Sequence, residues 1–151
     1  LEIGPGPGLT TDWLRQRVTH LTALEIDPRL AGALKQRLRG TNVRVIEDDA
    51  TKMPFEDRSF SAVISLTMLH HVPSSALQDK LLAEARRVLR HGGVFVGIDS
   101  TPSLRFRLIH IGDTMIVVDP DTFGARLRAA GFSDPTIDGR PDRFRFRAYA
   151  R

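Results

Sequence analysis

The sequence predicts an α/β fold built on a doubly wound, mostly parallel sheet. Short apolar segments alternate five times with longer segments whose apolar residues recur at helical spacing. A glycine-rich turn follows the first apolar segment, and the chain ends in two strand-like segments joined by a turn-rich linker. The alternation favours a parallel sheet with helices on both faces, and the final pair favours an antiparallel hairpin.

The length and composition of the chain fit one globular domain. With 151 residues, 41% of them hydrophobic and 26% charged, the chain is long enough to bury a core, and we expect residues 1–151 to form a single domain. Its apolar segments are far shorter than the roughly 20 residues that cross a bilayer, and no signal peptide is visible. These features predict a cytoplasmic protein that does not enter a membrane.

The charge and the missing residue types exclude several kinds of site. The chain contains no cysteine, which excludes disulfides, thiolate zinc sites and a cysteine nucleophile, and no metal-ligand spacing is present. The formal net charge is +4, and most of the positive charge is arginine, a bias that is typical of a GC-rich bacterial genome. This charge attracts anions weakly and does not by itself indicate a nucleic-acid partner.

The first element is the end of a buried strand, Leu1–Ile3, followed by a glycine turn and a helix. Gly4, Gly6 and Gly8 alternate in the turn, where glycine permits unusual backbone angles and a close approach of the chain to a ligand. The amides at the start of the next helix, expected over Leu9–Val18, point into the same crevice. Because strands average about five or six residues, the chain is expected to begin inside its first strand. The apolar side of the helix is expected to consist of Trp13, Leu14 and Val18.

The middle of the chain predicts three further strands and one helix. The strands are expected at Leu21–Ile26, Val43–Ile46 and Phe60–Leu66, and the first is nearly all apolar, as in a strand buried on both faces. Asp27-Pro28 is typical of a helix start, with an N-cap followed by proline, and Gly40 ends that helix. Its buried stripe is expected to contain Leu30, Ala33, Leu34 and Leu38.

A long helix and a fifth strand follow. The helix begins at Ser75, with Gln78 three residues later as in a capping box, and Gly92-Gly93 is expected to end it. The fifth strand is expected at Val94–Ile98. Residues 100–118 fit neither period, and their position after the fifth strand predicts an excursion on the substrate side of the sheet.

The last part of the chain predicts a helix and a strand pair. Asp119-Pro120 repeats the cap-then-proline start, and Gly131 closes this helix. The final strands are expected at Phe132–Ile137 and Phe144–Tyr149. Alternation in the second of them puts arginines on one face and apolar residues on the other, and a solvated face is preferred over a basic patch for an anionic partner. The arginines are Arg143, Arg145 and Arg147, and the apolar residues are Phe144, Phe146 and Ala148.

Acidic residues follow two of the strands at a suitable distance from the glycine turn. Glu25 ends the second strand 17 residues beyond Gly8, where a carboxylate can accept both hydroxyls of a ribose, as in dinucleotide-binding folds. Asp27 is the rival for this role, but Pro28 follows it directly, so we assign Asp27 to the helix N-cap. Asp48-Asp49-Ala50 follows the third strand, and in isolation it would be interpreted as a solvated loop.

The glycine turn is not a dinucleotide fingerprint, because the spacing of its third glycine does not fit G-x-G-x-x-G. The order E-x-G-x-G-x-G, which starts at Glu2, resembles the first motif of the class I S-adenosylmethionine-dependent methyltransferases. Met53-Pro54-Phe55 and residues 85–93 resemble later motifs of that family, although Ser61 stands where the family usually has aspartate. The resemblance covers roughly the whole chain. Within the family, the sequence is similar to the small-molecule group that includes quinone and sterol methyltransferases.

The resemblance implies a Rossmann-like fold, with a mostly parallel seven-stranded sheet whose last strand inserts antiparallel beside the fifth. It implies S-adenosyl-L-methionine as the cofactor, with Asp49-Ala50 at the adenine and Ser65-Leu66 beside the methionine part. Family members place helices before the first strand, and these are expected to be missing here. The implied cofactor-binding residues are Glu2, Gly4, Gly6, Gly8, Glu25, Ile26, Asp49, Ala50, Ser65 and Leu66.

The resemblance also implies transfer of a methyl group from S-adenosylmethionine to an oxygen, nitrogen or carbon nucleophile of a small molecule by in-line displacement. No metal or covalent enzyme intermediate is required, because alignment and exclusion of water do most of the work. A weakly acidic nucleophile also needs a base, and the catalytic candidates are His110 and His70, with His71 as a third. A histidine at a strand end is more often a structural hydrogen bonder. His70 and His71 are adjacent, so their side chains are expected to diverge. His110 and Asp113 fit either an oriented pair or ordinary polar residues of a loop.

Two other functions stay open. The missing helices favour a domain that keeps the fold but serves as a binding or assembly module, completed by another subunit, and a homodimer is one candidate assembly. The arginines of the last strand favour an RNA methyltransferase. However, Ser65–Met68 lacks the Pro-Pro-Tyr type of signature that amino-group methyltransferases of bases carry. A small-molecule acceptor is therefore preferred over nucleic acid.

Overall fold

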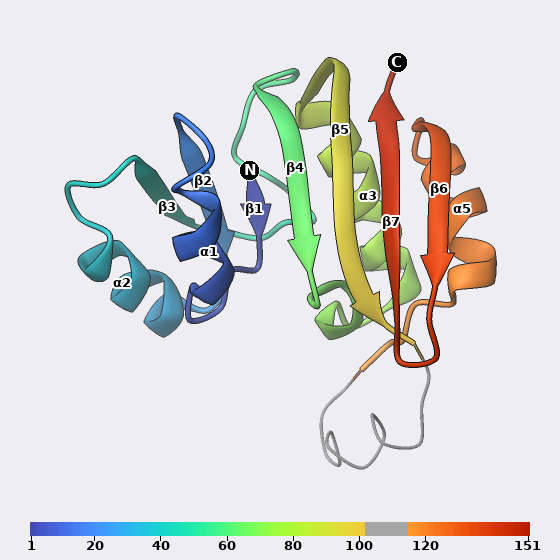
Figure 1. Ribbon diagram of the computed structural model, residues 1–151, viewed down its shortest axis with the longest axis horizontal. Helices are drawn as coiled ribbons and strands as arrows, with labels where there is room; N and C mark the ends of the chain where they lie inside the picture. Colours follow the sequence, from blue (N-terminus) through green and yellow to red (C-terminus); the bar gives the residue numbers. More distant parts are fainter. Residues whose placement is uncertain (102–114) are drawn as a thin grey trace.

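The computed structural model describes residues 1–101 and 115–151, and within them it contains one seven-stranded sheet in the order β3-β2-β1-β4-β5-β7-β6 (Figure 1). The strands are β1 (Glu2–Ile3), β2 (Leu21–Glu25), β3 (Val43–Glu47), β4 (Phe60–Leu66), β5 (Leu89–Ser100), β6 (Ser133–Gly139) and β7 (Arg143–Ala150). The helices of these residues are α1 (Leu9–Leu14), α2 (Pro28–Arg37), α3 (Ser75–Val88) and α5 (Pro120–Ala129), with a short 3-10 helix η1 (Leu69–His71).

The pairing of the strands confirms the predicted α/β fold. β1 to β5 pair in parallel, and β7 lies antiparallel between β5 and β6. The chain moves outward from β1 to β3 and then returns to place β4 on the other side of β1. Such a reversal opens a crevice outside the carboxyl ends of the strands, where ligands bind in open α/β sheets.

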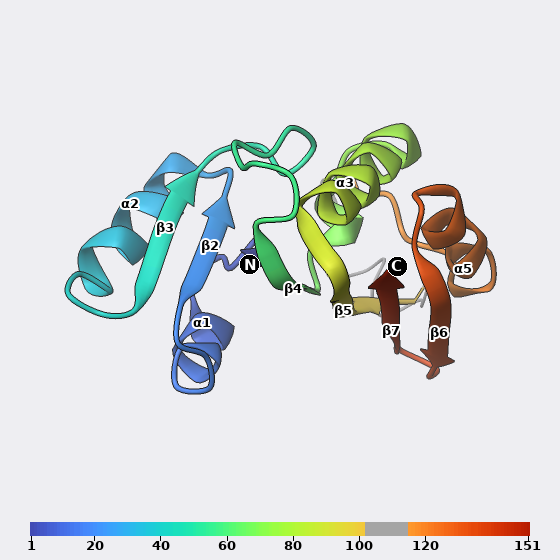
Figure 2. The same cartoon turned by 90° about the horizontal axis from the view of Figure 1, so that it is seen from above.

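Two apolar cores cover opposite faces of the sheet. In β2, Leu24 belongs to the larger core and Ala23 to the smaller one, because consecutive strand side chains point to opposite faces. The larger core lies beneath α3 and α5, which Figure 2 shows on the same side of the sheet. The smaller core lies between α2 and the strands β2 and β3. The packed helices thus hold the strands, while the loops at their carboxyl ends are left to form a site.

The helix α1 is shorter than predicted, because it ends at Leu14 rather than Val18. The side-chain amide of Asn42 lies 2.9 Å from the carbonyl oxygen of Arg15 and 2.8 Å from that of Val18. These hydrogen bonds hold the carbonyls in a turn, so they are not available for another turn of helix. The predicted apolar side is wrong in part: Leu14 is buried, but Trp13 is 57% exposed and Val18 is also exposed.

The helix α2 begins as predicted, since Oδ1 of Asp27 accepts hydrogen bonds from two amides of the first turn. Its predicted buried stripe is right for Leu34 and Leu38 but wrong for Leu30 and Ala33, which are exposed. The first turn projects beyond the sheet, where Leu30 lines a cavity instead of the core. A pattern of apolar residues cannot distinguish these two surroundings.

The start of α3 differs from the prediction in its cap. Oγ of Ser74, not of Ser75, accepts a hydrogen bond of 3.1 Å from an amide of the first turn. Gln78 therefore forms no capping box. Its side chain is 1% exposed, and its Nε2 donates to the carbonyl oxygens of Leu69 and Ile116. Gln78 joins the turn after β4 to a segment 38 residues further along the chain.

The strand β5 is longer than predicted. It starts at Leu89, which pairs with Phe60 of β4, and it ends at Ser100. The predicted helix end at Gly92-Gly93 is therefore late, because pairing with β4 has already begun when the chain reaches these glycines.

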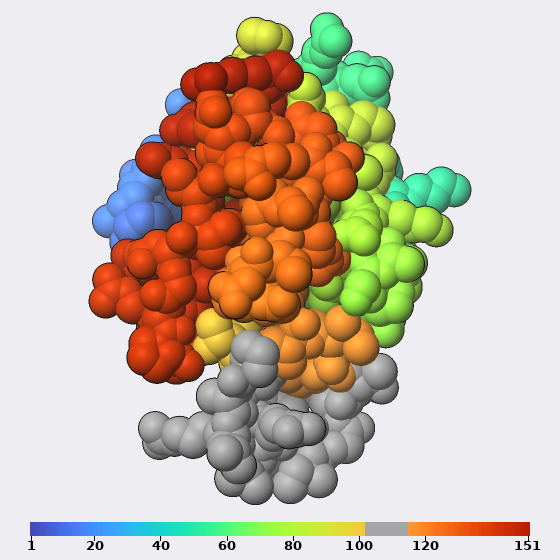
Figure 3. All heavy atoms as spheres, turned by 90° about the vertical axis from the view of Figure 1, so that its right-hand side faces the viewer, coloured from blue at the N-terminus to red at the C-terminus, as the bar shows by residue number. Residues whose placement is uncertain are grey.

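The alternation predicted for β7 is confirmed, with Arg143, Arg145 and Arg147 exposed and the intervening apolar residues buried. Those apolar residues pack toward α5, which with β6 covers this end of the molecule in Figure 3. Residues 102–114, most of the predicted excursion, lie outside the described residues. Of the remainder, Ile116 donates a backbone hydrogen bond of 3.1 Å to the carbonyl oxygen of His70.

Candidate cofactor site and active site

A cavity of about 590 Å³ lies at the carboxyl ends of β1, β2, β3 and β4, where the strand order reverses. This volume is within the usual range of small-molecule sites, roughly 300–1,000 Å³. The glycine turn, the ends of β2 and β4 and the loop after β3 all contribute to its wall. Of the predicted cofactor-binding residues, Gly4, Gly6, Glu25, Ile26, Asp49, Ala50 and Leu66 line the cavity.

The glycine turn has the backbone conformation that only glycine adopts easily. Gly4, Gly6 and Gly8 have φ angles of 62°, 55° and 83°. A Cβ on Gly4 would lie 2.2 Å from Cγ of Met68, whereas a Cβ on Gly6 would meet no atom of the described residues within 4 Å. Because Gly6 lines the cavity, the space beside its Cα is where a ligand can contact the backbone.

Glu25 is the acidic residue that the structure places beside this turn. It is 5% exposed, and its Oε2 accepts a hydrogen bond of 2.9 Å from the amide of Gly6. Its Oε1 accepts a hydrogen bond of 3.0 Å from the amide of Asp27. Each carboxylate oxygen has a second lone pair, so the group can still accept hydrogen bonds from two hydroxyls of a ligand. The side chain of Asp27 is occupied as the cap of α2, as predicted.

The loop after β3 forms the next part of the wall. Oδ1 of Asp49 accepts a hydrogen bond of 2.8 Å from the amide of Thr51, and Oδ1 of Asp48 accepts one from the amide of Asp49. These bonds within the loop fix its turn. Ala50, Ile26 and Leu30 add apolar surface to the same cavity. Apolar walls with a carboxylate beside them suit a purine nucleoside.

Three predicted cofactor residues do not line the cavity: Glu2, Gly8 and Ser65. Glu2 is buried, and its carboxylate accepts hydrogen bonds from the hydroxyls of Thr10 and Thr11, at 2.5 Å and 2.7 Å. It thereby ties the start of α1 to β1. Oγ of Ser65 is buried and finds no hydrogen-bond partner among the described residues. Direct contact of these three residues with a cofactor stays a prediction.

The wall formed by the end of β4 includes residues outside the predicted cofactor-binding set. Thr67 lines the cavity with a φ of 52°, a left-handed conformation that costs energy for a threonine and that is concentrated at functional sites. Met68, Val72 and Leu81 add apolar surface. The sequence does not mark this conformation of Thr67, whose amide donates a hydrogen bond to the carbonyl oxygen of Ile98 in the neighbouring strand β5.

The histidines after β4 have different surroundings. His70 is 3% exposed, does not line the cavity, and its Nδ1 lies 2.5 Å from Oδ1 of the fully buried Asp99. His71 is exposed and lines the cavity. The expectation that their side chains diverge is wrong, because the ring centroids are 4.2 Å apart. His110 and Asp113 lie outside the described residues.

In a comparison with protein families, residues 1–97 match the family described as "Methyltransferase domain". The chain belongs to this methyltransferase family. Its sheet, with β7 antiparallel beside β5, is that of the class I S-adenosylmethionine-dependent methyltransferases, which confirms the resemblance seen in the sequence.

The methyltransferase domain is similar to proteins with different acceptors. It is 43% identical over 65 residues to a probable ribosomal RNA small subunit methyltransferase A of Thermococcus onnurineus, covering 43% of this chain and 23% of that protein. It is 36% identical over 87 residues to the ubiquinone/menaquinone biosynthesis C-methyltransferase UbiE of Brucella canis, covering 55% of this chain and 31% of that protein. The chain thus spans less than a third of the length of either relative.

Among solved structures, the methyltransferase domain is similar to a phosphoethanolamine N-methyltransferase 2 of Haemonchus contortus in complex with S-adenosyl-L-methionine. The TM-score is 0.84 at 14% identity, over 98% of this chain and 47% of that one, which shows a shared fold. In residues 1–101 and 115–151, no helix is both long and apolar enough to cross a membrane. A cytoplasmic location stays a prediction.

Proposed function

We propose that residues 1–151 act as one domain that binds S-adenosyl-L-methionine and transfers its methyl group to an oxygen, nitrogen or carbon nucleophile of a small molecule. The carboxylate of Glu25, held at the glycine turn inside the cavity, is the observation that carries this proposal. Membership of the methyltransferase family supports it.

The residues of the cavity fit this cofactor. Glu25 would accept hydrogen bonds from the two ribose hydroxyls, and the backbone at Gly4 and Gly6 would lie against the methionine part. Asp49 and the amide of Ala50 would bind the edge of the adenine, whose faces would contact apolar side chains of the wall. When bound, S-adenosylmethionine supplies a methyl group on a positively charged sulfur, which keeps the electron pair of the broken carbon–sulfur bond.

The acceptor would approach from the end of β4, where Thr67, Met68 and His71 line the cavity. A hydroxyl or carbon acceptor loses a proton as its electron pair forms the bond to the methyl group. We infer that His71 takes this proton, because it faces the cavity whereas His70 is buried against Asp99. The neighbouring His70 ring, which Asp99 fixes and which is tilted by 44° against the His71 ring, would hold His71 in place.

Calorimetry with S-adenosylhomocysteine tests the cofactor, with NAD⁺ as the control ligand. We expect binding of the former and none of the latter, and a folded protein that binds neither would refute the proposal. A screen of quinols, fatty acids and amines for the mass of an added methyl group then tests the acceptor. Binding without transfer to any acceptor would favour a binding or assembly module.

RNA is the second candidate acceptor. The similarity to a ribosomal RNA methyltransferase and the exposed arginines of β7 favour it. Electrostatic binding of RNA weakens steeply as salt is added, because counterions are released from the phosphates. Fluorescence anisotropy with a structured RNA between 50 and 200 mM salt, roughly the range in which that effect is large, tests this alternative. Absent or salt-insensitive binding would exclude it.

A further inference from the structure

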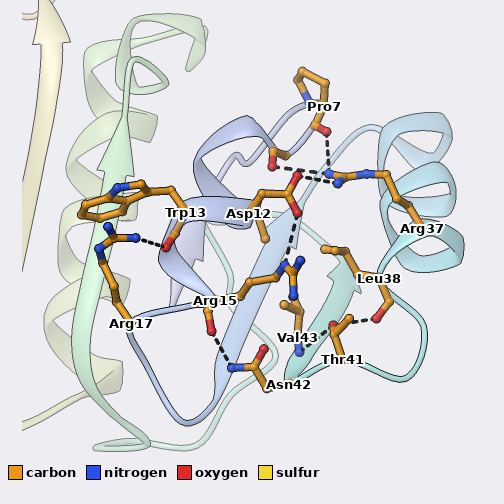
Figure 4. A network of polar contacts seen from close by, with 12 residues as sticks. Pro7, Asp12, Trp13, Arg15, Arg17, Arg37, Leu38, Thr41, Asn42 and Val43 are labelled. Carbon is orange, nitrogen blue, oxygen red and sulfur yellow. Dashed lines mark hydrogen bonds and ion pairs between the residues drawn. The ribbon is translucent and has the colours of Figure 1, made fainter.

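Arg37, the last residue of α2, reaches across to the outer side of the glycine turn (Figure 4). Its Nη2 donates hydrogen bonds to the carbonyl oxygens of Pro7, at 3.1 Å, and Gly8, at 3.4 Å. Its Nη1 lies 2.5 Å from Oδ2 of Asp12, in the first turn of α1. One guanidinium therefore joins two carbonyls of the turn to the helix that follows it. Arg37 does not line the cavity.

Apart from the hydrogen bonds that Thr10 and Thr11 donate to Glu2, the start of α1 has little other side-chain support. The helix is only six residues long, and its N-cap is Gly8, which forms no side-chain cap. Short helices are marginally stable without such support. A guanidinium has five donors in a rigid planar fork, so it can bind a carboxylate and carbonyl oxygens at the same time. Asp12 has a pKa below its usual range, and the hydrogen bond from Arg37 is the main cause.

The bonds to Arg37 also help to hold the direction of the turn's amides, together with the hydrogen bond of 3.1 Å that the amide of Asp12 donates to the carbonyl oxygen of Gly8 within α1. In a planar trans peptide the N–H points opposite to the C=O. When the carbonyl of Gly8 points toward Arg37, the amide of Leu9 points away from it, and Leu9 lines the cavity. Amides at a helix start are donors for anionic groups of a ligand.

The glycine turn is thus held by two residues near opposite ends of α2. At the start of α2, Glu25 accepts the amides of Gly6 and Asp27, and at its end Arg37 binds the carbonyls of the turn. The body of α2 packs on β2 and β3 through a buried stripe that includes Leu34. Arg37 is therefore anchored to the same rigid unit as the carboxylate expected to bind the ribose.

We propose that Arg37 is a positioning residue for the cofactor, which fixes the glycine turn and the first amides of α1 relative to Glu25. This inference rests on the proposed function. Arg37 touches no ligand atom and acts only through Pro7, Gly8 and Asp12. Its loss should therefore weaken cofactor binding in protein that is still folded.

The test compares Arg37→Gln and Arg37→Lys with Arg39→Gln, a control that removes the same charge from an exposed position two residues later. S-adenosylhomocysteine is titrated by calorimetry into each variant at a temperature where each is folded. We expect Arg37→Gln to raise the dissociation constant ~10-fold, or about 1.4 kcal/mol. Arg37→Lys should lie in between, because an ammonium keeps the charge but lacks the planar fork. Arg39→Gln should bind like the unchanged protein.

A second variant keeps the test informative if Arg37→Gln fails to fold. Asp12→Asn removes the half-buried carboxylate that pairs with both Arg37 and Arg15, and should raise the dissociation constant ~3-fold, given the modest strength of ion pairs near the surface. The emission of Trp13, the only tryptophan and part of α1, reports whether the start of that helix has moved. Dissociation constants within twofold of the unchanged protein in all variants, even with lower unfolding midpoints, would assign Arg37 a purely structural role. If the unchanged protein does not bind S-adenosylhomocysteine, the proposed function itself is overturned.

Discussion

The amide of Gly6 donates a hydrogen bond of 2.9 Å to Oε2 of Glu25, a residue 19 positions later in the chain. This bond joins the turn after β1 to the end of β2, and both residues line the cavity. The carboxylate is therefore oriented before any ligand binds. A ligand hydroxyl that meets it gains a hydrogen bond without the cost of ordering a flexible side chain.

Glu25→Gln should weaken the binding of S-adenosylhomocysteine roughly 10- to 100-fold, because hydrogen bonds to an ionised group contribute roughly 1.5–3 kcal/mol. The side-chain NH₂ of glutamine would also meet the backbone amide of either Gly6 or Asp27. Both of these amides are donors, so one of the two hydrogen bonds would be lost. Calorimetry measures the effect. Glu47→Gln is the matched control, since Glu47 lies beside Glu25 in the register of β3 but is exposed and outside the cavity wall. Equal affinity in both variants would contradict a role for Glu25 in the site.

Gly97→Ala should destabilise the sheet severely. A Cβ at this position in β5 would lie 2.2 Å from the carbonyl oxygen of Ser65 in β4 and 2.4 Å from the ring of Phe146 in β7. The carbonyl belongs to the paired strand and cannot move aside, so we expect a loss of roughly 3 kcal/mol, the upper range for an overpacked core. Gly32→Ala in α2 is the control. Within residues 1–101 and 115–151, a Cβ there meets nothing within 4 Å, so helix propensity should stabilise the protein by about 0.5–1 kcal/mol. Urea unfolding measures both changes, and similar values for both would refute this reasoning.

Glu84 should make the stability depend on pH. Its carboxylate accepts hydrogen bonds from Arg87 and from the amide of Met53, which joins α3 to the loop after β3. The hydrogen bond from Arg87 is the main reason that the pKa of Glu84 is lowered from 4.5. A lowered pKa means that the stabilisation is fully present above pH 4.5 and disappears as the pH falls through the folded-state value.

Glu84→Gln should therefore be less stable than the unchanged protein at pH 7, by about 1 kcal/mol once solvent screening is taken into account. This difference should shrink as the pH falls below 4.5. Denaturant unfolding between pH 7 and pH 3.5 measures it, with the exposed Glu56→Gln as the control. A difference that is constant over this range would show that the ion pair with Arg87 does not contribute.

The sequence predicted the elements well and their surroundings less well. The alternation of strands and helices along the chain and the caps at Asp27 and Asp119 follow from local signals, since cap, proline and glycine positions act within a few residues. The exposure of Trp13 and Ile26 did not follow, because both were assigned from apolar character and not from what lies opposite them. Trp13 faces open surface, whereas Ile26 lines the cavity.

In the candidate site, too, some residues could be predicted from the sequence and some contacts could not. Glu25, Asp49 and the glycine turn were found from spacing along the chain, because Glu25 ends β2 and the other two follow strands whose ends lie at the cavity. The contact of His70 with Asp99 and the reach of Arg37 could not be found in this way. They join residues 29 and 25 positions apart, and their partners are determined by how the elements pack.

Gln78 provides the last prediction, because its buried amide joins the turn after β4 to the segment beyond residue 114. Its Nε2 donates to the carbonyl oxygens of Leu69 and Ile116, and its Oε1 accepts from Nη1 of Arg126 in α5. Gln78→Leu leaves these groups without a partner of similar geometry. We expect a loss of roughly 2–3 kcal/mol in the free energy of unfolding, since each buried polar group that loses its partner costs roughly 1–3 kcal/mol.

The effect of Gln78→Leu should be local as well as global. The amide of Ile116 donates a hydrogen bond to the carbonyl oxygen of His70, directly beside the bonds that Gln78 makes. In Gln78→Leu, the hydrogen exchange of the Ile116 amide should therefore become faster. Gln78 does not line the cavity, and the affinity for S-adenosylhomocysteine should therefore stay within about twofold of the unchanged protein. The exposed Gln36→Leu in α2 is the control and should change neither quantity. Unchanged protection of Ile116 in Gln78→Leu would mean that the segment is held by other contacts and that Gln78 does not anchor the acceptor side of the site.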